Sequence, residues 1–119
     1  MRKIIILIVV CIYAISCKSQ DCSTLKSTFS SYSQAIREVK ASTFSIKEST
    51  STTNSSWITS ATYYSCNGET GYFIYTTNRS YQYIHQQLPI KIWKEFKNAS
   101  SKGSYYNTHI KHKYKLQLY

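Results

Sequence analysis

Three short runs of β-branched and aromatic residues, each bounded by turn-forming residues, constrain the fold of this chain more than any other feature. The runs cover residues 57–65, 72–77 and 80–85. A turn at residues 66–71, with two glycines able to take positive φ, separates the first two, and Asn78 with Arg79 separates the second from the third. Short strands joined by tight turns pair with their sequence neighbours, so this pattern predicts a three-stranded antiparallel meander.

A helical pattern follows the third run and is expected to cover one face of the sheet. Pro89 suits the first turn of a helix, where its missing N–H has no intrahelical partner to lose. The apolar side of this helix comprises Ile92, Trp93, Phe96 and Ala99. Gly103 suits a left-handed C-cap, and a short second helix is expected from Ser104, with Tyr106 and Ile110 facing inward. The predicted fold class is therefore α+β, a small meander covered by one main helix and a short C-terminal helix.

The segment before the predicted sheet is rich in Ser and Thr, yet it carries a helical apolar stripe. Apolar residues recur at spacings of four, three, four and three: Leu25, Phe29, Tyr32, Ile36 and Val39. This spacing predicts an N-terminal amphipathic helix, whose start Asp21 and Ser23 can cap. Because an isolated Ser-rich helix is marginal, we expect the stripe to pack on the domain, with self-association as the alternative.

A short strand followed by a loop is expected to connect this helix to the domain. Phe44 and Ile46 alternate with Ser45 and Lys47 as in a half-buried strand, and the polar run at residues 49–56 is expected to be a loop and the domain boundary. The predicted organisation is a signal peptide at residues 1–16, a lipid attachment and tether at 17–22, a Ser/Thr-rich helix, strand and linker at 23–55, and a domain at 56–119.

The N-terminus has the parts of a secretory signal peptide. Arg2 and Lys3 supply positive charge, residues 4–12 form an apolar run too short to span a bilayer comfortably, and small residues precede Cys17. Residues 14–17 read Ala-Ile-Ser-Cys and resemble a bacterial lipobox, whose cysteine is diacylated. We therefore expect a lipoprotein of the bacterial cell envelope, anchored to a membrane and facing the periplasm. The alternatives are a plain signal-peptidase cut before Cys17, with secretion into the periplasm, and an uncleaved anchor.

Export changes the interpretation of the other cysteines, because an oxidising compartment allows thiols to pair. With Cys17 acylated and Cys11 removed, Cys22 and Cys66 remain. We expect them to form a disulfide between the N-terminal helix and the first turn of the domain, which stabilises the fold by about 4 kcal/mol on the chain-entropy estimate. Two free thiols, or Cys17 paired with Cys22 in an unlipidated form, are the alternatives.

A series of spaced motifs runs through the predicted domain. Its positions are Ser55, Ser56, Ile58, Tyr63, the triplet Tyr81-Gln82-Tyr83, Leu88, Pro89, residues 99–107, Ile110 and Tyr114. In this order they resemble the KTSC domain, a short module named for its occurrence at the C-terminus of some lysyl-tRNA synthetases. Residues 85–87 stand where that family has about two residues, which implies a longer loop. The resemblance implies a fold class, and RNA binding has been suggested for the family.

The predicted domain is basic and carries a candidate binding surface near its end. Residues 57–119 include eight Lys or Arg and two Glu, a net charge of +6, and net charge bears on partners and solubility rather than on fold. The candidate surface comprises Lys102, Tyr105, Asn107, Lys111, Lys113 and Lys115. Free N–H groups at the start of the second helix would add to its attraction for an anion. A solvated charged tail is the alternative.

Two further candidates lie on the third predicted strand. Tyr81 and Tyr83 have the same strand parity and therefore face one side of the sheet, as the stacking of bases or sugars would require. They would also suit the core under the main helix. We favour core packing for at least one of them.

No arrangement of catalytic residues stands out. The domain has two carboxylates, Glu69 in a turn and Glu95 beside lysines on a helix, so paired-acid catalysis is not expected. No Asp follows Asp21 and no nucleophile elbow is present, which disfavours a Ser-His-Asp triad. His109 and His112, three residues apart, could share a helix face and bind a metal, with His85 or a thiol as a third ligand. Such spacing is common by chance, and we expect neither a metal nor a cofactor.

These observations predict a non-enzymatic binding or structural module of the cell envelope. Its partner is expected to be anionic, namely lipid phosphate, a cell-wall polymer or an acidic protein. Charge and aromatic content also support nucleic-acid (RNA) binding, the first alternative, although export disfavours it. A small hydrolase is the second alternative.

Overall fold

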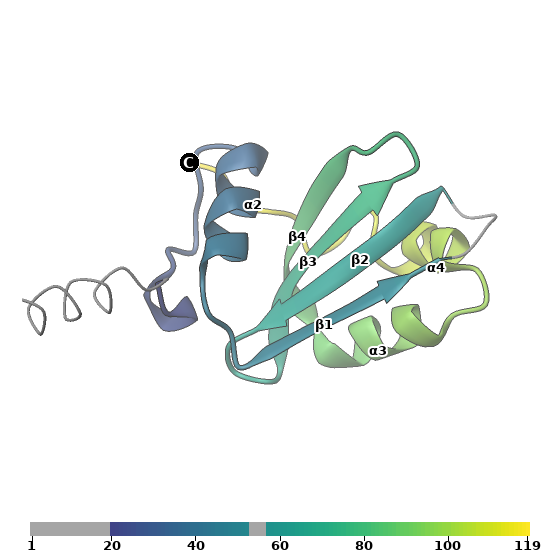
Figure 1. The fold of residues 1–119 in the computed structure, drawn as a ribbon, viewed down its shortest axis with the longest axis horizontal. Coiled ribbons are helices and arrows are strands. Elements are labelled where there is room, and N and C mark those ends of the chain that lie inside the picture. Colours follow the sequence, from purple (N-terminus) through teal and green to yellow (C-terminus); the bar gives the residue numbers. More distant parts are fainter. Residues whose placement is uncertain (1–19, 53–56) are drawn as a thin grey trace, which may run out of the picture.

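The computed structural model describes residues 20–52 and 57–119. Its elements are η1 (Cys22–Thr24), α2 (Tyr32–Ala41), β1 (Ile46–Ser51), β2 (Ile58–Ser65), β3 (Thr70–Thr77), β4 (Gln82–Pro89), α3 (Ile90–Asn98) and α4 (Lys102–His109). The strands form one antiparallel sheet in the order β1-β2-β3-β4 (Figure 1). The α+β class and the meander predicted from the sequence are confirmed. The predicted signal peptide and Cys17 lie outside the described residues. Among the residues that are described, none of the helices has the length and apolar character needed to span a membrane.

The sheet has a fourth strand, which the prediction of a three-stranded meander lacks. β1 pairs with β2 along its whole length, so the loop expected at residues 49–56 starts too early by three residues of strand. Hydroxyl side chains suit this edge position because Ser49 Oγ and Thr62 Oγ1 lie 2.9 Å apart and hydrogen-bond across the pair. Polar composition alone therefore did not distinguish the end of β1, residues 49–51, from a loop.

Side chains of the sheet alternate between two hydrophobic clusters on opposite faces. The α3/α4 face consists of Ile58, Ala61, Tyr63, Phe73, Tyr75, Leu88, Trp93, Phe96, Tyr106 and Ile110. The α2 face consists of Phe29, Ala35, Val39, Tyr64, Ile74, Ile84 and Leu116. Successive strand residues point to opposite sides, which is why the neighbours Tyr63 and Tyr64 belong to different clusters. The sheet is thus covered on both faces.

Helix α3 carries the centre of the α3/α4 face. Pro89 is its N-cap, and Trp93 and Phe96 are fully buried. The Trp93 indole lies nearly parallel to the Tyr63 ring, with the ring centroids 5.4 Å apart. Its Nε1 donates a hydrogen bond of 2.8 Å to Glu48 Oε1 on β1. The edge strand therefore satisfies the polar atom of the largest buried side chain.

Helix α4 begins two residues earlier than expected, and Gly103 is not a C-cap. Ser101 is the N-cap of α4, and its Oγ accepts a hydrogen bond of 3.3 Å from the N–H of Ser104. Gly103 is buried inside the helix. Helix α3 ends instead with Ala99 in an extended conformation, at φ −68°. The predicted glycine C-cap of α3 is therefore wrong. Tyr106 and Ile110, which were predicted to face inward, are both buried.

Helix α2 is shorter than the apolar stripe that predicted it. Ser31 is its N-cap, and Ser31 Oγ accepts a hydrogen bond of 3.0 Å from the N–H of Gln34. Leu25 and Phe29 therefore precede the helix, and Asp21 caps only η1. The helical part of the stripe packs on the α2 face, as expected.

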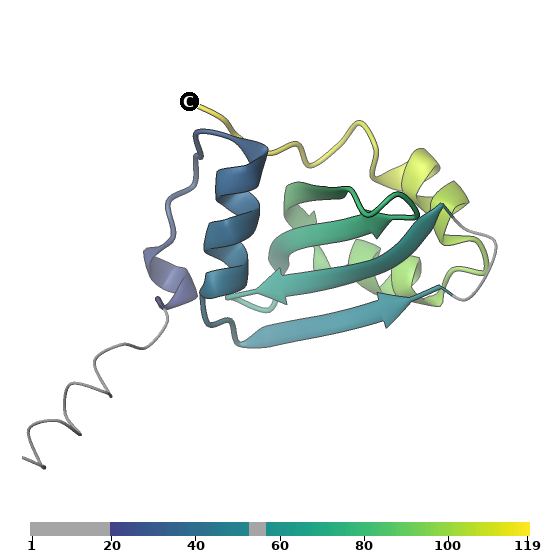
Figure 2. The same cartoon turned by 45° about the horizontal axis from the view of Figure 1, so that its top comes forward.

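The chain after α4 returns along the outer edge of β4 to reach α2 (Figure 2). The backbone N–H of Gln86 donates to the carbonyl oxygen of Tyr114 at 2.9 Å. Gln86 Nε2 donates to the carbonyl oxygen of Ser27 at 2.7 Å, and Gln86 Oε1 accepts from the N–H of Gln117 at 2.9 Å. One residue of β4 therefore connects the N-terminal segment with residues 110–119, which we call the tail.

The turn between β2 and β3 depends on a buried serine and two glycines. Ser65 Oγ donates to the carbonyl oxygen of Thr70 at 2.7 Å and accepts from the N–H of Gly68 at 2.9 Å. Gly68 has a positive φ of 78°, which favours glycine. A Cβ on Gly71 would lie 2.3 Å from the carbonyl oxygen of Tyr64, so no side chain fits there. This turn places Cys66 on the surface.

Candidate functional site: a tyrosine and histidine hollow

A hollow of ≈ 550 Å³ opens at the outer edge of β4, between α2, α4 and the tail. We call it the Tyr-His hollow. It is lined by Tyr32, Tyr75, Tyr83, Tyr106, His85, Lys111 and Lys115, with Gln82, Ile84 and Leu116 completing the wall. Its volume lies in the range of sites that take small ligands.

The floor of the Tyr-His hollow is a hydrogen-bond chain through three buried side chains. Tyr75 Oη donates to Tyr106 Oη at 2.9 Å, and Tyr106 Oη lies 2.9 Å from His85 Nε2. His85 Nδ1 lies 3.1 Å from the carbonyl oxygen of Lys113, which can only accept. In the neutral imidazole the proton is therefore on Nδ1, and Tyr106 donates to Nε2.

Burial favours the neutral form of each group in this chain. It lowers the pKa of His85, although the carbonyl of Lys113 acts in the opposite direction. It raises the pKa of Tyr75 and of Tyr106, and negative charge on the nearby Tyr32 and Tyr83 would raise both further. Four phenol hydroxyls are thus close enough to interact electrostatically. Each hydrogen of the chain is donated within it, so the floor offers a ligand the remaining lone pairs of the two neutral phenol oxygens.

Two tyrosines form the open walls. Tyr83 is 43% exposed and Tyr32 is 44% exposed. The ring of Tyr83 packs on that of Tyr75, with the centroids 5.4 Å apart and the planes at 30°. Tyr81 is 60% exposed and does not line the hollow. The preference for core packing of at least one of Tyr81 and Tyr83 is wrong. Both rings remain exposed at the edge of the sheet, where Tyr81 immediately precedes β4 and Tyr83 lies near its start.

The charged groups of the hollow are all cationic. Lys111 and Lys115 are exposed, and no carboxylate is among the described residues that line the wall. Lys40 on α2 adds a third ammonium group close by, because its Nζ donates to Gln82 Oε1 at 2.8 Å. The other end of that amide, Gln82 Nε2, donates to Thr76 Oγ1 at 3.2 Å. The field at the opening is therefore positive.

The structure brings together only part of the predicted binding set. Tyr83, Lys111 and Lys115 line the hollow, whereas Tyr81, Lys102, Tyr105, Asn107 and Lys113 do not. Tyr32, Tyr75 and Tyr106 were not predicted as site residues, and His85 was predicted only as a possible metal ligand. Strand parity could have indicated His85, because it follows Tyr81 and Tyr83 at steps of two residues and so faces the same side.

At the start of α4, where the sequence suggested an anion site, the helix cap and nearby groups already engage part of the polar surface. The Ser104 N–H is already bonded to the Ser101 cap. Lys102 Nζ lies 3.4 Å from the carbonyl oxygen of Ala99, and Tyr105 donates to Glu95 Oε1 at 2.7 Å. The predicted surface is thus divided, because Lys111 and Lys115 line the Tyr-His hollow whereas Tyr105 lines a separate pocket with Glu95.

The two carboxylates of the domain lie on different elements, Glu95 on α3 and Glu69 in a turn. Glu95 accepts from Tyr105, and after burial this contact is the main cause that raises the pKa of that phenol. Glu69 is exposed in the turn between β2 and β3. His109 packs its ring on Tyr105 at 4.4 Å between centroids. In the described part of the chain, neither glutamate is hydrogen-bonded to a histidine.

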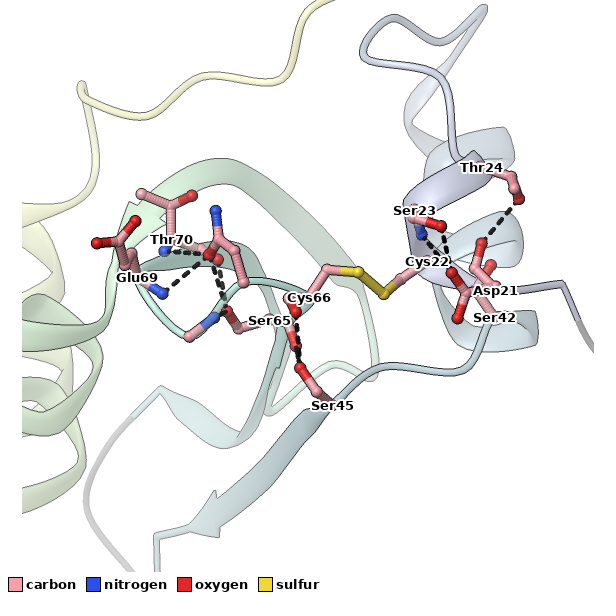
Figure 3. The surroundings of a disulfide bond; sticks show 12 residues. Asp21, Cys22, Ser23, Thr24, Ser42, Ser45, Ser65, Cys66, Glu69 and Thr70 are labelled. Carbon is pink, nitrogen blue, oxygen red and sulfur yellow. Dashed lines mark hydrogen bonds between the residues drawn. A yellow bond between two sulfur atoms is a disulfide. The ribbon is translucent and has the colours of Figure 1, made fainter.

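Cys22 and Cys66, the pair expected from the sequence, form a disulfide (Figure 3). Their Cα atoms lie 5.9 Å apart, within the usual range for a bridge. Ser45 Oγ donates to the carbonyl oxygen of Cys66 at 2.7 Å, so the segment before β1 is also attached to this turn. The bridge joins η1 to the turn between β2 and β3.

The residues beside this bridge do not fit a metal site. Within residues 20–52 and 57–119, one cluster has metal-binding residue types, namely Asp21, Cys22 and Cys66. Both of its sulfur atoms are in the disulfide and are not thiolates. Asp21 Oδ2 accepts from the N–H of Ser23 at 3.0 Å, and hydrogen bonds from Ser23 lower the pKa of Asp21. The three histidines are not gathered in such a cluster.

The central part of the chain matches a known family. Residues 54–114 match the model of the KTSC domain. The chain belongs to the KTSC family. Comparison with curated proteins and with solved structures gives no match. The KTSC match thus identifies the domain without supplying a function.

The KTSC segment contains β2, β3, β4, α3 and α4, but it omits α2, β1 and the end of the tail. Three residues of the hollow, Tyr32, Lys115 and Leu116, therefore lie outside it. The longer loop expected at residues 85–87 is instead an irregularity within β4, where Gln87 has a positive φ of 60°. The segments before and after residues 54–114 are called the added segments. The irregularity in β4 occurs where Gln86 contacts both of them.

Proposed function

We propose that this KTSC protein is a non-enzymatic binding module of the bacterial cell envelope that contacts an anionic partner. The Tyr-His hollow carries this proposal, because Lys111 and Lys115 stand beside four tyrosines and no described carboxylate lines the wall. A recess with one sign of charge raises the local concentration of oppositely charged ligands. A cell-wall polymer or a lipid phosphate group is therefore a better partner than a neutral surface.

The location of the protein is part of the proposal. A positive N-terminus, an apolar run and the Ala-Ile-Ser-Cys ending support export and lipidation of Cys17. The Cys22–Cys66 disulfide suits an oxidising compartment. Mass spectrometry of the mature N-terminus should find a diacylglyceryl cysteine at position 17. An unmodified Cys17 would remove the lipid anchor.

Nucleic acid remains the alternative partner. The exposed ring of Tyr83 and the neighbouring lysines are the side-chain types that bind single strands without sequence preference. Export disfavours this function because RNA is not an expected occupant of the envelope. Binding of an oligonucleotide in the same assay would therefore redirect the proposal.

The test of an anionic partner is the salt dependence of binding. The full chain should bind vesicles or polymers that carry phosphate or carboxylate groups, and binding should weaken as salt increases. Lys111→Gln with Lys115→Gln should weaken binding and flatten its salt dependence. Lys91→Gln with Lys94→Gln removes the same charge from α3, outside the hollow, and is the matched control. An equal loss in both double variants would show an effect of net charge alone and contradict a localised site.

A further inference from the structure

We infer that the ligand of the Tyr-His hollow is an acidic saccharide, meaning a sugar ring that bears a carboxylate or phosphate group. This inference rests on the proposed function and specifies the chemistry of its partner. It depends on three properties of the hollow: an exposed aromatic wall, a floor of hydroxyl groups and a rim with positive charge only.

The aromatic wall suits the apolar face of a sugar ring. Tyr83 is held from one side by the ring of Tyr75, at 5.4 Å between centroids, and is still 43% exposed. Tyr32, 44% exposed, stands on α2 at the other side of the same hollow. The C–H groups of a pyranose pack on an aromatic ring, while the phenol hydroxyls remain able to bond to the hydroxyls at the edge of the sugar.

The floor adds polar groups that are already oriented. Tyr75, Tyr106 and His85 form one directional hydrogen-bond chain that ends on the carbonyl oxygen of Lys113. This chain ties α4 and the tail to β4. Lys111 and Lys115 lie two residues on either side of that attachment point, so the backbone that carries these lysines is fixed before a ligand arrives. Such preorganisation lowers the entropy lost on binding.

The charges select an acidic sugar over a neutral one. Lys111 and Lys115 are the only ionised groups of the described lining, and both are cationic. An acidic group on the sugar would reach these ammonium groups while the ring lies on Tyr83. A neutral sugar would leave the two charges without a counterion.

The same lining favours a sugar over a nucleobase. Bidentate recognition of adenine uses a side-chain amide, which presents a donor and an acceptor together. Gln82 is the amide of this wall, and both of its ends are engaged, with Lys40 and Thr76. Phenol hydroxyls and ammonium groups instead match ligands that are rich in oxygen.

Isothermal calorimetry with the oxidised full chain tests the inference. The probes are a uronic-acid oligosaccharide, its neutral carboxyl-reduced counterpart, a sugar phosphate, inorganic polyphosphate and a single-stranded oligonucleotide. We expect binding of the two acidic sugars, and loss of about tenfold or more in affinity for the neutral counterpart. Polyphosphate, which has no sugar ring, should bind more weakly per charge.

Variants of two exposed tyrosines, Tyr83 on β4 and Tyr81 immediately before it, separate stacking from folding. Tyr83→Ala should reduce affinity for the acidic sugars by about tenfold, and Tyr83→Phe should retain most of it because the ring remains. Tyr81→Ala is the matched control, since Tyr81 is more exposed and lies outside the lining. Equal affinities for Tyr83→Ala and the parent overturn the sugar site.

The outcomes also distinguish this inference from the proposed function. Binding of polyphosphate and acidic sugars alike, lost in the Lys111 and Lys115 double variant and unaffected by Tyr83→Ala, would support an anion-binding module and refute the saccharide. Preferential binding of the oligonucleotide would refute the saccharide in favour of nucleic acid. Absence of binding to every anionic probe would refute both.

Discussion

The two faces of the sheet are covered in different ways. On the α3/α4 face, the helices follow β4 directly, and the contact is made by large rings such as Trp93, Phe96 and Phe73, each fully buried. On the α2 face, the cover comes from segments before β1 and after α4, and its buried helix residues are the small Ala35 and Val39. A disulfide and the side chain of Gln86 hold these segments in place.

This difference indicates that the two faces have different sources of stability. The α3/α4 face lies almost wholly within the KTSC segment and is stabilised by burial of aromatic area. The α2 face depends on cross-links that bring distant segments to β4. We therefore expect the first face to determine whether the domain folds, and the second to determine whether the Tyr-His hollow exists, since Tyr32 and Lys115 belong to the added segments.

The largest effect is expected from Trp93→Ala. This change removes a fully buried indole and its hydrogen bond to Glu48, and should lower the free energy of unfolding by about 5 kcal/mol. Urea denaturation followed by circular dichroism measures it. Val39→Ala, the corresponding change on the α2 face, should lose about 2 kcal/mol. Equal losses would contradict the proposed difference between the faces.

Removal of the disulfide is expected to have an intermediate effect on stability, larger at the α2 face than at the α3/α4 face. Cys22→Ser with Cys66→Ser opens a loop with a sequence separation of 44 residues, and should lower stability by about 3 to 4 kcal/mol. Hydrogen exchange should accelerate at the amides of α2 and change little in β2 and β3. Uniform acceleration throughout the sheet would show that both faces unfold as one unit.

The smallest effect is expected from protonation of His85, which lies between α4 and the tail. Burial holds the pKa of the folded imidazole below its ordinary value of 6.5. Below pH 6.5 the unfolded chain binds a proton that the folded chain does not, so stability falls as pH decreases, until the pH reaches the lower folded pKa. Above pH 6.5 this contribution to stability is fully present.

A pH series of urea denaturation curves measures this dependence. His85→Gln should remove most of the slope just below pH 6.5, whereas His109→Gln, which changes an exposed imidazole, should leave it. An unchanged slope in His85→Gln would assign the dependence to another group.

Local patterns were sufficient to predict the α3/α4 face. The strand runs, Pro89 and the helical spacing of Trp93 and Phe96 each report on neighbours a few residues apart. A short strand was expected near Phe44 and Ile46, but residues 49–51 at the end of β1 were mistaken for a loop because hydroxyl side chains serve equally in loops and in the edge of a sheet. Helix α2 was predicted too long because several serines compete as N-cap, and spacing does not indicate that Ser31 is the one used.

Local sequence patterns could not predict the Tyr-His hollow. Its walls come from α2, β3, β4, α4 and the tail, and only the tertiary structure places Tyr32 beside Tyr83. The sequence did contain the basic residues Lys111 and Lys115. It offered no signal that they, rather than Lys102, would meet the exposed tyrosines, because that depends on the direction of the tail.

The pairing of Phe29 with the tail has a consequence for the order of folding. The N–H of Phe29 donates to the carbonyl oxygen of Gln117 at 2.9 Å, and the N–H of Tyr119 donates to the carbonyl oxygen of Phe29 at 3.0 Å. Contacts between residues so distant in sequence require closure of a very long loop, and they form slowly. The meander and α3 have local contacts and can assemble first. The Tyr-His hollow, whose wall includes Tyr32 and the tail lysines, is then completed late in folding, so a partly folded chain should lack the ligand binding proposed for it.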